Sequence, residues 1–207
     1  EALRGLGGIV INAKGQRFVN ELDLRARVVD KMREQQKDKT NLPFRLLMND
    51  VVKDAFGPNM GFYIKFGLVK EYANLALLAD DTGMSEDIVF SMMKRYVQES
   101  KKGKDKFGKS VFPNGESYDP NEKIYAAEIT PVIHYTMGGL SINDKSQILD
   151  INDDIINGFY GAGEVTGGVH GKNRLAGNSL LECVVYGRIA ARNVIDYCKN
   201  VNQQKDI

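Results

Sequence analysis

The glycine-rich segment of residues 158–194 constrains the fold most strongly, because it orders a short apolar strand, a loop and a long helix. Gly161 and Gly163 stand at the end of the strand, where residues without a Cβ allow a backbone to approach a ligand closely. The carboxylate of Glu164, just beyond them, can accept both hydroxyls of a ribose. The helix begins near Ser179, and the free N–H groups at its start favour a negatively charged group. A plain packed turn shows the same order of elements, so this pattern alone leaves both interpretations open.

The sequence before this segment predicts a mixture of strands and helices. Alternating residues around a turn at 13–16 predict a hairpin with strands near 8–12 and 17–19. The other expected elements follow from helical spacing, apolar runs and glycine breaks. They are a helix through Leu24, Val28 and Met32, a buried strand at 42–48, and short helices over 51–78 broken at Gly57, Gly61 and Gly67. A further helix would start at Ser85 with Ile88, Met92 and Tyr96 on one face, followed by a polar and mobile connector at 99–123.

Charge and composition exclude several classes of protein. The 28 Lys and Arg nearly balance the 27 Asp and Glu, which removes the positive surface of a protein that binds nucleic acid or anionic membranes. No stretch approaches the roughly 18 apolar residues of a membrane span. Cys183 and Cys198 lie in apolar helical sequence rather than in a disulfide or zinc framework. We therefore expect a soluble protein of the cytoplasm or mitochondrion.

Three segments resemble one known family. The glycine-rich segment is similar to the C-terminal FAD signature of the fumarate reductase and succinate dehydrogenase flavoprotein superfamily. The matching runs are GAGE at 161–164, HGKNRL at 170–175 and GNSL at 177–180. An anionic reduced flavin ring would satisfy the preference for negative charge at the helix start.

The second segment is TPVIHYTMGG at 130–139, which resembles the H-x-TMGG element of the same superfamily. A single His on a strand is more often a satisfied core residue than a ligand. The resemblance implies instead that His134 and Arg174 bind a carboxylate of a dicarboxylate substrate, in a site that also includes Gly177 and Glu1.

The third segment comprises EALRG at 1–5, GQRFVNE at 15–21 and Arg25, and it resembles the capping-domain pattern of soluble fumarate reductases. Surface salt bridges are the alternative interpretation. The resemblance implies that Arg25 protonates the substrate and that Glu1 and Arg4 relay the proton to it.

The implied reaction is physically coherent. Arg is the side chain that grips a carboxylate with two parallel hydrogen bonds, as a small dianion requires. Hydride from N5 of reduced flavin would add to one alkene carbon, and surrounding cations would stabilise the negative charge that builds next to it. Guanidinium is an unusually weak acid, but a carbanion is a far stronger base, so the proton from Arg25 would move downhill.

The resemblance also implies bound cofactors. FAD, expected to be non-covalent, would contact Tyr135, Gly163, Glu164, Arg174, Ala176, Asn178, Ser179, Leu180 and Leu181. Oxygen ligands of a hard monovalent cation such as Na⁺ would come from Thr136, Met137, Gly138, Glu164 and Thr166.

We thus expect an α+β capping domain at 1–130, N-terminally truncated, and then the C-terminal part of an α/β FAD-binding domain of Rossmann-like, glutathione-reductase type at 131–207. The chain begins at Glu1 without a Met and lacks the G-x-G-x-x-G turn that holds the FAD pyrophosphate, so we expect the rest of the same polypeptide to complete it. The expected function is FAD-dependent reduction of fumarate to succinate, with a small-molecule or flavin electron donor and an inactive isolated fragment. The alternatives are a succinate dehydrogenase, an aspartate oxidase, another enoate reductase or a non-catalytic dicarboxylate-binding module.

Overall fold

The computed structural model describes residues 2–205, with side chains described for residues 2–202. The chain divides into two compact units, which meet between Val132 and Ile133 and which we call unit 1 and unit 2. This division lies two residues after the boundary expected from the sequence. Within residues 2–205, no helix is long and apolar enough to cross a membrane.

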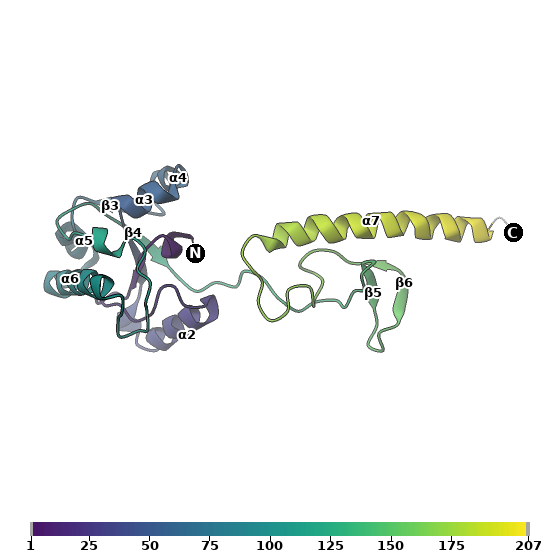
Figure 1. The fold of residues 1–207 in the computed structure, drawn as a ribbon, viewed down its shortest axis with the longest axis horizontal. Helices are drawn as coiled ribbons and strands as arrows, with labels where there is room; N and C mark the ends of the chain where they lie inside the picture. Colours follow the sequence, from purple (N-terminus) through teal and green to yellow (C-terminus); the bar gives the residue numbers. More distant parts are fainter. Residues whose placement is uncertain (1, 206–207) are drawn as a thin grey trace. The chain divides into compact units, whose positions relative to one another are not determined.

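Unit 1 is built on a four-stranded sheet in the order β1-β2-β4-β3, in which every neighbouring pair is antiparallel (Figure 1). The strands are β1 (Ile9–Ile11), β2 (Phe44–Asn49), β3 (Lys70–Tyr72) and β4 (Ile124–Ile129). Every residue of β2 is buried, as expected for a strand with a partner on each side and helices on both faces. The predicted buried strand and the first strand of the predicted hairpin are therefore confirmed.

Helices cover both faces of this sheet. They are α1 (Ala2–Gly5), α2 (Arg25–Gln36), α3 (Asp50–Phe56), α4 (Asn59–Lys65), α5 (Leu75–Thr82) and α6 (Glu86–Lys102), with short 3₁₀ turns η1 (Lys39–Asn41) and η2 (Gly115–Ser117). The side chains of Asn49 and Asn74 accept hydrogen bonds from Val52 and Leu77 and so begin α3 and α5. Gly83, with φ of 69°, ends α5 in the left-handed conformation that glycine adopts at low cost.

Alternation along the strands creates two separate apolar cores. Ile9, Ile11 and Leu47 pack with α5 and α6 on one face. Val10, Leu46 and Met48 pack with α2, α3 and α4 on the other. Successive residues of one strand thus pack into opposite cores, because side chains alternate between the two faces of a sheet with a period of two residues.

A cluster of buried charges ties the segment after α6 to the start of the chain. The guanidinium of Arg17 donates to Glu21, Asp105 and Glu99 at 2.8, 2.8 and 3.2 Å. Nζ of Lys109 donates to Glu21 at 2.9 Å and to the hydroxyl of Tyr96 at 3.0 Å. We call these six residues the Arg17 cluster.

The predicted polar connector at 99–123 is corrected at its start and at two buried charges. Its first residues complete α6, and both Asp105 and Lys109 are buried. Asp105 and Lys109 are buried because they are partners of Arg17 and Glu21, whereas most other residues of the segment are exposed.

Four smaller expectations are corrected by the structure. The second hairpin strand is reduced to one bridge, Ile11 to Arg17, because the Arg17 side chain then enters the buried cluster. Gly61 lies inside α4 and does not interrupt it. Ile88 is exposed while Val89 takes its place in the core, and Ser85 stands at the N-cap without a side-chain cap bond.

Unit 2 contains the hairpin of β5 (Gln147–Leu149) and β6 (Ile155–Tyr160) and the long helix α7 (Asn178–Lys205) (Figure 1). The predicted start of this helix near Asn178 is confirmed. No apolar side chain of the described part of unit 2 is fully buried, whereas Ser146, Thr166, Arg174 and Glu182 are. Large apolar side chains along α7, among them Leu180 and Val184, are exposed instead.

Candidate functional site

A buried carboxylate organises the polar centre of unit 2. Glu182, in the first turns of α7, accepts hydrogen bonds at Oε2 from the hydroxyl of Tyr135 at 2.5 Å and at Oε1 from the hydroxyl of Thr166 at 3.2 Å. Nε2 of His170 lies 2.8 Å from Oε2. Burial alone would raise the pKa of Glu182, but the hydrogen bonds from Tyr135, His170 and Thr166 lower it below 4.5. The group is therefore an anion that holds three side chains from two loops.

Tyr135 in turn supports Arg174. The guanidinium carbon of Arg174 lies 4.4 Å from the centroid of the Tyr135 ring, within range of a cation–π contact. Arg174 is buried, and its Nη1 donates to the carbonyl of Leu175 at 3.1 Å. The hydrogen bond to Glu182 raises the pKa of Tyr135 to about 12, so the phenol stays neutral. The plane of the Arg174 guanidinium is thus fixed from two directions.

His134 precedes Tyr135 in the chain, and its side chain is exposed. The structure brings Tyr135, His170, Arg174 and Glu182 together. It leaves His134 at the surface of unit 2, next in sequence to this group.

The loop after His134 lies beside the segment 163–167. Leu140 forms a parallel bridge with Thr166, and Oε1 of Glu164 accepts a hydrogen bond from the N–H of Thr136 at 2.9 Å. Oγ1 of Thr166 also donates to the carbonyl of Gly163 at 2.8 Å. Four of the predicted cation ligands, Thr136, Gly138, Glu164 and Thr166, therefore come from two adjoining loops, and Met137 lies between the first two in sequence.

The chemistry of this loop pair suits a hard cation better than a transition metal. Backbone carbonyls, a threonine and one carboxylate are all oxygen donors. Across residues 2–202, no three His, Cys, Asp or Glu side chains group into a metal site. A monovalent ion such as Na⁺ fits the donors that are present.

The glycines that follow β6 allow close packing within the chain. A Cβ on Gly161 would meet the Thr166 side chain at 2.9 Å, and one on Gly163 would meet Sγ of Cys183 at 3.1 Å. Gly163 also has φ of 81°, a conformation that strains other residues. These glycines admit the chain's own loop and helix α7, and the close approach of a ligand at this point stays a prediction.

The start of α7 fits a flat, partly apolar cofactor. Leu175, Leu180 and Leu181 are exposed there, and Ala176, Gly177, Asn178 and Ser179 surround them at the helix N-terminus. The backbone N–H of Asn178 donates a hydrogen bond to the carbonyl of Leu175 at 3.3 Å. A ring with apolar faces and a negatively charged edge could cover the leucines and approach the amide dipoles of the first turn. The residues predicted to contact FAD at this end of the helix are compatible with it.

The predicted acid and relay residues belong to unit 1. Arg25 is the first residue of α2 and is half-buried. Nη1 of Arg4 donates to the carbonyl of Glu21, which fixes its side chain beside the Arg17 cluster. Glu1 lies outside the described residues. The convergence of Arg25 on His134 and Arg174 stays a prediction.

Sequence reasoning missed the roles of Glu182 and His170. In the sequence, His170 stands out only as part of the HGKNRL run. Glu182 could have been found, because it is the one acidic residue in the apolar stretch 178–195. A single carboxylate among Leu, Cys and Val on a helix is worth testing for buried partners.

Comparison with known proteins identifies the family. Residues 1–180 match the family described as the FAD binding domain. The chain belongs to this family.

Several of the similar proteins are named fumarate reductases. Fumarate reductase 1 of Saccharomyces cerevisiae is 38% identical over 199 residues, which cover 94% of this chain and 42% of the yeast protein. A cytochrome-type fumarate reductase of Shewanella frigidimarina is 34% identical over 200 residues, covering 96% of this chain and 34% of that protein. The open conformation of a flavocytochrome c3 fumarate reductase superposes with a TM-score of 0.74 at 32% identity, covering 94% of this chain and 33% of that one.

These matches confirm the resemblance to the fumarate reductase and succinate dehydrogenase flavoprotein superfamily and the FAD-binding fold. The chain spans well under half the length of each relative.

Proposed function

We propose that this chain supplies the substrate-binding residues and the C-terminal part of the flavin domain of an FAD-dependent reductase that converts fumarate to succinate. The observation that carries the proposal is the arrangement of Arg174, held against Tyr135 by buried Glu182, close in sequence to the α7 N-terminus. The relatives named fumarate reductases support the substrate.

In this proposal, residues 1–130 are the capping domain and residues 131–207 belong to the FAD domain. FAD binds non-covalently at Tyr135, Gly163, Glu164 and the first turn of α7. The remainder of the same polypeptide supplies the strand and glycine turn that hold the pyrophosphate. The exposed apolar face of α7 supports this, since unit 2 has no buried apolar core of its own in its described part.

Arg174 and His134 bind one carboxylate of the substrate, and Gly177 and Glu1 line the same site. Because the Arg174 guanidinium is already fixed by Tyr135 and Leu175, little side-chain entropy is lost when it takes up a carboxylate. FAD, when bound, supplies the hydride for the alkene. Cations next to the carboxylate stabilise the charge that develops on the adjacent carbon.

Arg25 delivers the proton to that carbon, and Glu1 and Arg4 return a proton to Arg25. The transfer is favourable although guanidinium is a weak acid, because the developing carbanion is the stronger base. The hydrogen bond from Arg4 to the Glu21 carbonyl gives the relay a fixed end in unit 1.

The test uses the polypeptide that includes the complete flavin domain. We expect it to purify with flavin absorbance and to oxidise a reduced viologen dye when fumarate is added. His134→Ala should raise KM for fumarate at least tenfold, because one carboxylate ligand is lost. Lys172→Ala, an exposed residue of the same unit, is the matched control and should leave KM unchanged.

Other outcomes separate the alternatives. A yellow protein that reduces crotonate better than fumarate would assign a different enoate to the site, and one that only oxidises succinate or aspartate would assign the corresponding relative. A colourless protein that binds fumarate without turnover would make the chain a dicarboxylate-binding module.

A further inference from the structure

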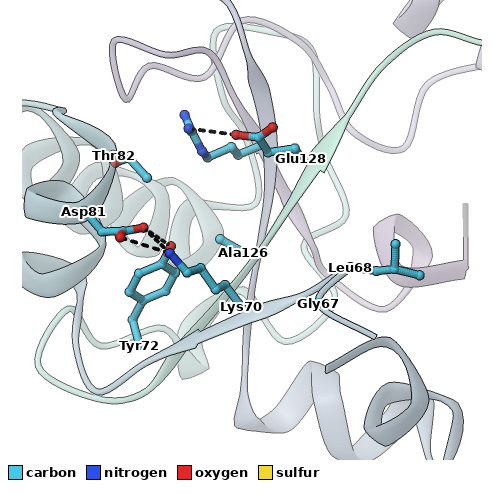
Figure 2. A pocket seen from close by; sticks show the side chains of 9 residues that line it. Gly67, Leu68, Lys70, Tyr72, Asp81, Thr82, Ala126 and Glu128 are labelled. Carbon is cyan, nitrogen blue, oxygen red and sulfur yellow. Dashed lines mark hydrogen bonds and ion pairs between the residues drawn. The ribbon is translucent and has the colours of Figure 1, made fainter. Parts of the chain in front are cut away.

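A hollow of about 470 Å³ opens in unit 1 beside the C-terminal end of α5 (Figure 2). Residues of β2, β3, β4 and α5 line it, and we call it the Arg45 pocket. Its volume falls in the range of small-molecule sites in proteins. It consists of unit 1 residues alone, so it is independent of the proposed reductase function.

The strand register explains why charged side chains meet there. Arg45 pairs with Glu128 across β2 and β4, and Lys70 pairs with Ala126 across β3 and β4. Paired residues project to the same face of an antiparallel sheet, and positions two apart along a strand share that face. The pocket therefore lies on the sheet face that α5 and α6 also cover.

Arg45 is the feature that points to a ligand. Its side chain is nine-tenths buried, and Nη2 donates to Oε1 of Glu128 at 3.0 Å. Nη1 is also buried but has no hydrogen-bond partner among the described protein groups. A buried charged donor without an acceptor is costly, so a ligand oxygen at Nη1 would be stabilising.

The other charges of the pocket are already matched. Nζ of Lys70 donates to both carboxylate oxygens of Asp81 at 2.9 and 2.8 Å, and the hydroxyl of Tyr72 donates to the same carboxylate at 2.7 Å. Figure 2 shows Lys70, Tyr72 and Asp81 as one group and Glu128 as a separate one. Arg45 is buried but depends on a partner that can leave, because the Glu128 side chain is 66% exposed.

The charge balance limits the ligand to a monoanion. When a ligand carboxylate takes the place of Glu128 on Arg45, the exposed Glu128 side chain is hydrated instead, and Arg45 offers one positive charge to the ligand. The planar guanidinium then offers Nη1 and Nη2 as a fork that matches a carboxylate. Leu68 and Ala126 provide apolar wall for the body of the ligand.

We propose that the Arg45 pocket binds a small organic acid whose single carboxylate replaces Glu128 on Nη1 and Nη2 of Arg45. The apolar body of the acid lies against Leu68 and Ala126. Glu128 acts as an internal competitor for the site.

The test is an NMR titration of the ¹⁵N-labelled chain with benzoate, with benzamide as its uncharged analogue and inorganic phosphate as a second oxyanion. We expect saturable shifts of the amides of Gly67, Thr82 and Glu128 with benzoate only. Arg45→Met should weaken binding more than tenfold. Glu128→Gln should tighten it about two- to fivefold, because the neutral amide competes less well than a carboxylate for Arg45. Lys31→Gln, on the surface of α2, is the control and should change nothing.

Glu128→Gln keeps the proposal testable if Arg45→Met fails to fold, because Glu128 is a surface residue. Equal shifts with benzamide, unchanged or weaker binding in Glu128→Gln, or the absence of saturable shifts would each overturn the proposal. Tighter binding of phosphate than of benzoate would overturn the choice of a carboxylate.

Discussion

Nε2 of His170 lies 2.8 Å from Oε2 of Glu182, a carboxylate that α7 carries into the interior of unit 2. The same oxygen accepts the hydrogen bond from Tyr135, whose ring supports Arg174. The position of the predicted substrate arginine therefore depends on a helix residue that acts on it through Tyr135.

Glu182→Gln should lower the pKa of Tyr135 from about 12 toward 10.0, because a neutral amide no longer disfavours the tyrosinate. The measurement is the pH dependence of the ¹³Cζ resonance of Tyr135 in labelled protein. Asp196→Asn, a change of an exposed carboxylate on the same helix, should leave that pKa where it is. An identical titration of Tyr135 in the Glu182 variant would show that the hydrogen bond is not formed in solution.

Arg17→Met should lower the free energy of unfolding of unit 1 by about 3–5 kcal/mol, because it leaves the carboxylates of Glu21 and Asp105 buried with too few donors. Urea unfolding followed by circular dichroism measures the change. Arg27→Met breaks an ion pair with Asp23 in which Arg27 is 70% exposed, and should cost no more than about 1 kcal/mol. Equal losses in the two variants would contradict a structural role for the Arg17 cluster.

The stability of unit 1 should fall at alkaline pH. Tyr118 is buried and donates to the carbonyls of Gly7 and Leu47, and burial raises its pKa well above 10.0. The unfolded chain releases this proton near pH 10 while the folded chain retains it, so the contribution is complete below pH 10 and is lost as pH rises further. The expected slope is about 1.4 kcal/mol per pH unit for one such group.

Tyr118→Phe should make this alkaline decline shallower. Tyr96, whose pKa burial also raises, and Lys109, whose pKa burial lowers, remain in both proteins, so the difference between the two slopes isolates Tyr118. The lysine acts in the opposite direction, because its unfolded form binds the proton more tightly. Urea midpoints at pH 8 to 11 provide the comparison, and parallel curves would contradict the assignment.

Arg25→Lys in the polypeptide with the complete flavin domain should leave KM for fumarate within about threefold and slow kcat by orders of magnitude. The ammonium keeps the positive charge, but its shape and donor geometry differ from those of guanidinium, so the proton path is broken. Steady-state kinetics with a reduced dye measures both constants. Arg27→Lys on the same helix is the control, and unchanged turnover in the Arg25 variant would remove Arg25 from the mechanism.

Sodium should bind the loop pair of unit 2. In choline buffer, added Na⁺ should raise turnover of the complete protein and broaden its own ²³Na resonance. Glu164→Gln should weaken both effects, because it removes the one formal negative charge among the proposed ligands. Turnover that is independent of Na⁺ in ion-depleted buffer, with no broadening, would argue against the site.

Sequence patterns predicted the elements whose residues carry a clear period. The apolar run of β2 and the long helix α7 are both where they were expected. The edge strand β3 was not predicted, because Lys70, Glu71 and Tyr72 show no alternation of apolar and polar residues. Charged side chains of this kind are common on the exposed edge of a sheet. A sequence pattern of apolar residues reveals a strand only where its side chains are buried, and two of the three residues of β3 are exposed.

The Arg17 cluster could not be predicted for a different reason. Lys109 and Asp105 stand in sequence that is typical of a solvated loop, and their partners Glu21 and Arg17 are 88 residues away. Burial of a charge depends on such distant partners rather than on neighbours. Glu182 also has distant partners, but its place as the one acidic residue of an apolar stretch marks it for attention. Tyr135 and Arg174 were found because recognisable motifs surround them.

The unequal interiors of the two units decide what a denaturation curve of this chain can measure. Every large apolar side chain that is fully buried in the described structure precedes residue 130. Heat capacity and denaturant sensitivity both scale with the apolar surface exposed on unfolding. The cooperative unfolding transition of the purified chain therefore belongs to unit 1. A substitution in α7 can weaken the proposed binding of FAD while the melting temperature stays the same.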